Sequence, residues 1–280
     1  MPATTGTLSV PDAVLHYRVE GVGPPLLISE SGEGDADRSA DLVARLAESY
    51  SVITYDRRGL SRSRPDFPER GASLTEHADD VHRLLTALAD SPVRMLGCSL
   101  GAVIGMHVAV RHPGRIHTLV AHEPVAPRLL PDHERIRHVR ELATLRNLYD
   151  REGLDATIPE IARTLGIDPA HTDAEPGLTP QPMNARRIAN FDHFIRHDFT
   201  AVIQDTLDTS ALKNAGTHIV PAIGRTTPHT AFDRRCAVAL AELLGHETVD
   251  FPGGHNGNTS HPRAYAARLR QVLDLTFTTR

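Results

Sequence analysis

The chain has 280 residues, of which 40% are hydrophobic and 23% charged, a composition typical of a soluble globular protein. That length allows one sizeable α/β core with an inserted segment, or two small domains. No apolar run approaches the roughly 18–20 residues of a membrane span, and the first residues do not resemble a signal peptide. We therefore expect a cytoplasmic protein with no membrane partner. The net charge is −5 with interspersed signs, so we expect no nucleic-acid partner.

The first 125 residues predict strands and helices in alternation. Ser73-Leu-Thr-Glu76 is a capping box that opens a helix with Leu74, Ala78, Val81, Leu85 and Leu88 on one face. A second helix is expected over Leu100–Val110. We expect strands at Val14–Val19, Leu26–Ile28, Ser51–Tyr55, Val93–Gly97 and Ile116–Ala121. Such alternation predicts a mostly parallel, doubly wound sheet covered by helices on both faces.

The pattern changes after the strand Ile116–Ala121, which is the sixth when one further strand before Val14 is counted. Residues 126–215 carry no strand signal and predict only helices, at Arg135–Tyr149, Ile158–Leu165, Ala185–Phe199 and Ala201–Leu207. The α/β pattern then resumes with a strand at His218–Ile223, a helix at Ala231–Leu244, a strand at Glu247–Phe251 and a helix from Pro262. We therefore expect one α/β core, residues 1–125 and 216–280, with a helical cap inserted at 126–215.

The segment Gly97-Cys-Ser-Leu-Gly101 matches G-x-S-x-G, with Ser99 at its centre. A serine on a sharp strand-to-helix turn projects its hydroxyl above the edge of a sheet, and the two glycines let the chain pack tightly there. Here a buried strand precedes the motif and a helix follows it. The alternative, a glycine-rich turn without chemistry, fits this context less well, so we predict that Ser99 is a nucleophile.

The loop Phe251-Pro-Gly-Gly-His255-Asn-Gly257 lies between the last strand and the last helix. A histidine there can reach back over the sheet edge toward Ser99, and imidazole is a suitable general base near neutral pH. A lone loop histidine is usually a surface residue. Because the nucleophile motif precedes it in the chain, we predict that His255 is the base.

No metal or cofactor is expected. The two cysteines do not have the spacing of metal ligands. His193 and His197 would share one helix face, but no third ligand or Glu-x-x-His pattern accompanies them.

At this point the chain resembles the α/β-hydrolase superfamily over nearly its whole length. The segment Tyr55-Asp-Arg-Arg-Gly59-Leu-Ser-Arg-Ser63 is similar to the family's D-x-R-G-x-G-x-S segment. The usual His-Gly oxyanion loop is replaced by Glu30-Ser31-Gly32. Because this family uses backbone N–H groups to bind the oxyanion, the resemblance assigns that role to Leu100 and Gly32. Whether Glu30 takes part in the site is left open.

The resemblance also implies a triad acid, but its usual position, in a Gly-x-x-Asp context, is occupied by Thr227. We predict Glu123 instead, because it directly follows the sixth strand at the edge where strand carboxyl ends line the crevice. Some haloalkane dehalogenases of this superfamily carry their acid after strand six, at a similar spacing from the nucleophile. Asp233 is the other candidate.

The sequence therefore predicts a cofactor-independent serine hydrolase that cleaves an ester or a related acyl bond of a small molecule with a Ser-His-Glu triad. Thioesters, lactones and amides are included among such bonds. A non-hydrolytic member of the fold, which transfers or cyclises an acyl group or only binds a ligand, is the alternative.

Overall fold

The structure is a computed structural model that describes residues 3–168 and 173–275. Its nine described strands form one sheet in the order β1-β2-β4-β3-β6-β7-β8-β9, with β5 paired to β2. The pairs β1–β2 and β2–β4 are antiparallel, and every neighbouring pair from β4 to β9 is parallel. The strands are β1 Thr4–Val10, β2 Ala13–Glu20, β3 Pro25–Ser29, β4 Ser51–Tyr55, β5 Arg64–Pro65, β6 Val93–Cys98, β7 Ile116–His122, β8 His218–Gly224 and β9 Val249–Phe251.

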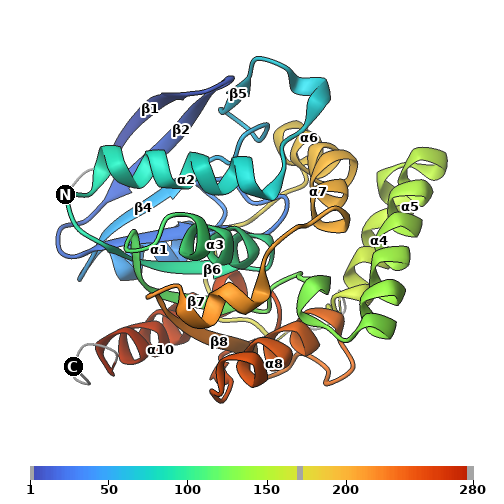
Figure 1. Cartoon of the computed structure of the whole chain (residues 1–280). Helices are drawn as coiled ribbons and strands as arrows, with labels where there is room; N and C mark the ends of the chain where they lie inside the picture. The colour runs from blue at the N-terminus through green and yellow to red at the C-terminus, as the bar shows by residue number, and fades with distance from the viewer. Residues whose placement is uncertain (1–2, 169–172, 276–280) are drawn as a thin grey trace.

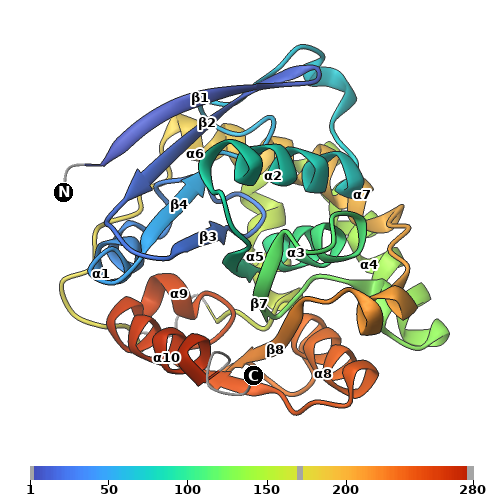
Figure 2. The ribbon, with the colours of Figure 1, turned by 60° about the vertical axis from the view of Figure 1, so that its left-hand side comes forward.

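Helices cover both faces of the sheet, as Figure 2 shows. On one face lie α2 (Leu74–Leu88), α3 (Leu100–Arg111) and α8 (Phe232–Leu244). On the other lie α1 (Ala40–Leu46) and α10 (Pro262–Leu275). Successive side chains of a strand point to opposite faces, so Met95 packs under the first layer and Leu96 under the second. The predicted doubly wound α/β fold is confirmed.

Between β7 and β8 the described residues form only helices and turns. The helices are α4 (Asp132–Glu152), α5 (Leu154–Thr164), α6 (Ala185–His193) and α7 (Phe199–Ile203), with turns η2 (Pro127–Leu129), η3 (Phe194–Asp198) and η4 (Thr209–Asn214). In Figure 1 these four helices gather at one side of the sheet. The remaining short helices are η1 (Pro68–Arg70) and α9 (Gly257–Ser260). None of the described helices has the length and apolar character needed to cross a membrane.

The structure differs from the sequence-based expectations in detail. The two-residue strand β5 shifts the labels, so the sixth strand of the sequence analysis is β7. The helix expected over Ala185–Phe199 is broken by η3, a π-helical turn. The helix expected over Ala201–Leu207 ends at Ile203, because the Asp205 carboxylate accepts the backbone N–H of Leu207 and stabilises a turn instead.

Candidate active site

Ser99 lies on a sharp turn between β6 and α3, which begins at Leu100. Its φ of 54° and ψ of −112° are sparsely populated for a residue with a side chain, and such strain is concentrated at functional sites. The Ser99 N–H donates to the carbonyl of His122 at 2.9 Å, which fixes the turn beside the end of β7. The serine is buried at the carboxyl end of β6, where the sequence placed it.

The two glycines of the motif are required by close packing. A Cβ added at Gly97 would lie 2.6 Å from the Cα of Ala102, and one added at Gly101 would lie 2.0 Å from the carbonyl oxygen of Ser29. The second contact also shows that the end of β3 lies directly against the start of α3. The loop that follows β3 therefore begins next to the Ser99 turn.

Gly32 in that loop is enclosed by the π-helical turn and by an arginine. The ring of Phe194 lies over it, so that a Cβ added at Gly32 would be 2.1 Å from ring carbons. The carbonyl oxygen of Gly32 accepts a hydrogen bond from the Arg57 guanidinium at 2.5 Å, and the same nitrogen donates to Asp198. Arg57, which lies in the Tyr55–Ser63 segment and was expected to brace the loop beneath the site rather than to react, thus holds this loop in place.

Glu30 points toward α9 rather than along the loop. It is buried, and its carboxylate accepts a hydrogen bond of 3.3 Å from the side-chain amide of Asn258. The same amide nitrogen donates to the hydroxyl of Ser39. Burial raises the pKa of Glu30 to about 7, although the contact with Ser39 opposes the shift. At neutral pH a large share of this side chain is therefore uncharged, which reduces its repulsion of any nearby anion.

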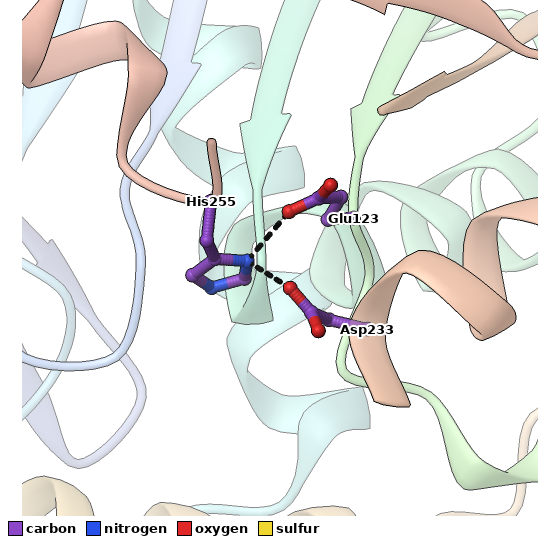
Figure 3. Close-up of side chains that lie close together, drawn as sticks. All are labelled: Glu123, Asp233 and His255. Carbon is purple, nitrogen blue, oxygen red and sulfur yellow. Dashed lines mark hydrogen bonds and ion pairs between the residues drawn. The ribbon is translucent and has the colours of Figure 1, made fainter. Parts of the chain in front are cut away.

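His255 meets two carboxylates at once, as Figure 3 shows. Its Nδ1 lies 3.0 Å from Oε2 of Glu123 and in even closer contact with Oδ2 of Asp233. The other oxygen of Glu123 accepts the N–H of Gly224 at 2.8 Å. All three side chains are buried. Both candidates for the acid thus lie on the same imidazole nitrogen, Glu123 from the end of β7 and Asp233 from the first turn of α8.

Glu123 is held in a strained position, with a φ of 43°. The Glu123 N–H donates to the carbonyl of Ala222 on β8 at 3.0 Å. Thr227, which occupies the usual acid position, is buried nearby in the turn that Gly224 opens. The Gly224 N–H therefore bonds an acid that comes from the neighbouring strand end.

The three groups shift one another's pKa strongly. Burial alone would raise the pKa of Glu123, but the hydrogen bond from His255 and nearby positive charge lower it to about 2. Burial raises the pKa of Asp233 to about 7, with His255 opposing and Glu123 adding to the shift. Burial alone would lower the pKa of His255, but Asp233 and then Glu123 raise it to about 10. Perturbation of this kind is typical of functional sites.

The same triplet is the group of metal-type ligands found within the described residues, with its ligand atoms all within 4.8 Å of one another. The contacts of Nδ1 with both carboxylates account for this cluster without an ion. A cavity of about 340 Å³ borders His255. It is lined by Gly166, Ile167, Asp168, Asp173, Thr226, Pro228, Gly254, Asn256 and Ser260.

Comparison with known proteins defines the class to which this fold belongs. Residues 24–186 match the family model described as the alpha/beta hydrolase fold. The chain is 35% identical to the uncharacterized hydrolase YraK of Bacillus subtilis over 98% of its own length and 97% of the relative's. A shorter match, 36% identical over 39% of this chain and 40% of the other, is to a protein named "Putative carbamate hydrolase RutD" from Azorhizobium caulinodans. The chain belongs to the α/β hydrolase fold family.

Solved structures show the same fold. One described as a "putative epoxide hydrolase" from Pseudomonas aeruginosa superposes with a TM-score of 0.74 at 22% identity, covering 99% of this chain and 97% of the other. A structure from a study of carboxylesterases of the thaumarchaeon Nitrososphaera gargenis gives a TM-score of 0.73 at 17% identity, covering 98% of this chain and 100% of the other.

Proposed function

We propose that the protein is a serine hydrolase that cleaves a carboxylic ester or a related acyl bond of a small molecule. The observation that carries this proposal is the strained, buried Ser99 at the carboxyl end of β6, together with His255 held by a carboxylate from the next strand end. Nucleophile, acid and base follow in the order Ser, Glu and His along the chain, the order of this fold's hydrolases.

In the proposed reaction, the Ser99 hydroxyl attacks a substrate carbonyl while Nε2 of His255 accepts its proton. Glu123 accepts the Nδ1–H and stabilises the imidazolium that forms. The backbone N–H groups of Leu100 and Gly32 are proposed to bind the oxyanion. The imidazolium then protonates the leaving group, and water attacks the acyl-enzyme to release the acid and restore Ser99.

A carbamate is included among the proposed substrates beside an ester, because part of the chain is similar to a protein named "Putative carbamate hydrolase RutD". Both bond types present a carbonyl carbon to a serine. We propose that residues 126–215 form a cap over the site, because Phe194 of this segment lies against Gly32. The inserted helices would then set the range of accepted acyl and leaving groups.

A fluorophosphonate probe tests the nucleophile directly. We expect it to label the wild-type protein and not the Ser99→Ala variant. The matched control is Ser260→Ala, because Ser260 also lies near His255 and its hydroxyl contacts the ring of His261 at 2.9 Å. Labelling that persists in Ser99→Ala and disappears in Ser260→Ala would contradict the assignment. Wild-type protein that takes no label would favour the non-hydrolytic alternative.

Turnover of a panel of acyl esters tests the pair of residues. We expect Ser99→Ala and His255→Ala each to lower kcat by at least about a thousandfold, and the double variant to be little worse, because members of a triad act as one unit. Near-normal turnover by His255→Ala on several esters would contradict the mechanism.

A further inference from the structure

The second carboxylate on Nδ1 of His255 has no role in a triad with a single acid. Asp233 is fully buried, comes from α8 rather than from a strand end, and contacts the same nitrogen as Glu123. The inference drawn from it below rests on the proposed function, since it concerns how the base of that reaction is held.

The two carboxyl groups are not equivalent. Glu123 accepts both Nδ1–H of His255 and the backbone N–H of Gly224. Asp233 contacts His255 closely, but within the described part of the chain neither of its oxygens has a well-formed hydrogen bond. A buried carboxylate that accepts no backbone N–H is less well stabilised as an anion than one that does, as Glu123 does from Gly224. A proton shared by the pair is therefore better placed on Asp233 than on Glu123.

Shared protonation also resolves a chemical problem. With two ionised carboxylates on one side, His255 would hold protons on both nitrogens, and Nε2 could not accept the proton of Ser99. If the carboxyl pair keeps one proton, a single negative charge faces Nδ1 and Nε2 is free. Two acids at short distance commonly retain one proton in this way.

The groups around Glu123, Asp233 and His255 add no charge that would decide where the shared proton lies. His122, whose Nε2 lies 3.9 Å from Glu123, is held neutral because burial lowers its pKa. Arg234 on α8 donates to the carbonyl oxygens of Gly224 and Thr227. The other titratable groups that act on the two acids are neutral, because burial raises their pKa values: Cys98 on β6, Cys236 on α8 and Tyr265 on α10.

We propose that Asp233 is a second acid of the triad: Glu123 and Asp233 together hold Nδ1 of His255 and keep one proton between them, so that either carboxyl group alone can orient the imidazole. No bond to substrate is made or broken by this pair. The shared proton stays on the carboxyl groups while Nε2 takes and returns the proton of Ser99. Asp233 is thus a positioning residue rather than a catalytic one.

The kinetic test compares Glu123→Gln, Asp233→Asn and the double variant. We expect each single variant to keep kcat within about tenfold of wild type, because one carboxylate still orients the ring. In the double variant kcat should fall by at least about a thousandfold, because no carboxylate then fixes the tautomer of the imidazole. The matched control is Asp205→Asn, which removes the carboxylate from another buried pair, Nε2 of His107 and Asp205 at 2.8 Å, and should leave kcat unchanged.

The titration of His255 gives a readout that needs no turnover. In ¹⁵N-histidine-labelled protein, with the signal assigned by its loss in His255→Gln, we expect two titration steps in the wild type. They should lie near pH 7 and pH 10, because the coupled groups release two protons. Each single variant should show one step. The pH profile of kcat/KM should likewise show two ionisations in the wild type and one in each single variant.

The outcomes separate the two proposals. Two titration steps without any hydrolysis would leave the shared proton in place and overturn the proposed function. A single step in the wild type would overturn the second acid. The same conclusion would follow if Glu123→Gln alone lost a thousandfold while Asp233→Asn matched wild type in rate and titration. If Asp233→Asn does not fold, the number of titration steps of His255 in the wild type still tests whether Asp233 is a second acid.

Discussion

At the scale of single residues, the position of a candidate site residue was predictable where it depends on one local pattern. Ser99 was predictable because G-x-S-x-G encodes its turn, and Glu123 because it directly follows a recognisable strand. The shared position of Asp233 was not predictable, since it depends on the angle at which α8 packs beside the end of β8. Arg57 was expected to brace the loop beneath the site, but its partners Gly32 and Asp198 were not predictable, because they are far from it in the sequence.

Gly32 offers a prediction at this scale. A methyl group there would lie 2.1 Å from the ring of Phe194, so Gly32→Ala should displace the loop whose N–H group is proposed to bind the oxyanion. We expect kcat to fall by about a hundredfold, the cost of losing one oxyanion donor. Phe194→Ala removes the ring, so combining it with Gly32→Ala should restore much of the lost kcat. A double variant as slow as Gly32→Ala, measured on the same ester, would contradict this account.

At the scale of elements, predictions held where the signal was local and failed where distant contacts decide. The capping box of α2 is present: Ser73 accepts from the N–H of Glu76, and Glu76 accepts from the N–H of Ser73. The break after His193 could not be read from periodicity. There the Arg57–Asp198 contact joins η3 to the loop that follows β4, and a π-helical turn replaces regular helix.

The capping box predicts a measurable effect on stability. Ser73→Ala leaves the N–H of Glu76 without its side-chain acceptor, and we expect the free energy of unfolding to fall by about 1 kcal/mol. Urea unfolding followed by circular dichroism would measure it. Thr86→Ala is the control, because Thr86 lies exposed later in α2 and its hydroxyl donates to the helix carbonyl of His82. That variant should change stability by less than about 0.5 kcal/mol.

At the scale of the whole molecule, the helices between β7 and β8 do not form a core of their own. Their side chains Leu142, Ile161 and Val202 belong to the same hydrophobic cluster as Met95 and Val103 beneath the sheet. Composition and periodicity predict that this stretch of the chain is helical but not that its core is continuous with that of the sheet, which depends on packing between distant segments. The buried ion pair between Arg57 and Asp198 joins the insertion to the loops around Ser99.

The buried ion pair between Arg57 and Asp198 should contribute measurably to stability. Asp198→Asn leaves the Arg57 guanidinium buried without its counterion, so the free energy of unfolding at pH 7 should fall by about 3–5 kcal/mol. Asp192→Asn is the matched control: Asp192, in α6, pairs with Arg196 at 2.6 Å, with side chains 43% and 51% exposed. Removing such an exposed charge should cost less than about 1 kcal/mol.

The pH dependence of the same variant has a definite sign. Burial alone would raise the pKa of Asp198, but Arg57 and His77 lower it below the ordinary value of 3.8. Its stabilising contribution is therefore present above pH 3.8 and is lost as the pH falls through the lowered value. The stability difference between wild type and Asp198→Asn, measured by urea unfolding, should be constant from pH 7 to 5 and shrink below 3.8.

Because Arg57 also holds Gly32, kcat should fall in the variant even at a temperature where it is fully folded. A folded variant with normal kcat would show that the Arg57–Asp198 ion pair stabilises the molecule without positioning the oxyanion loop.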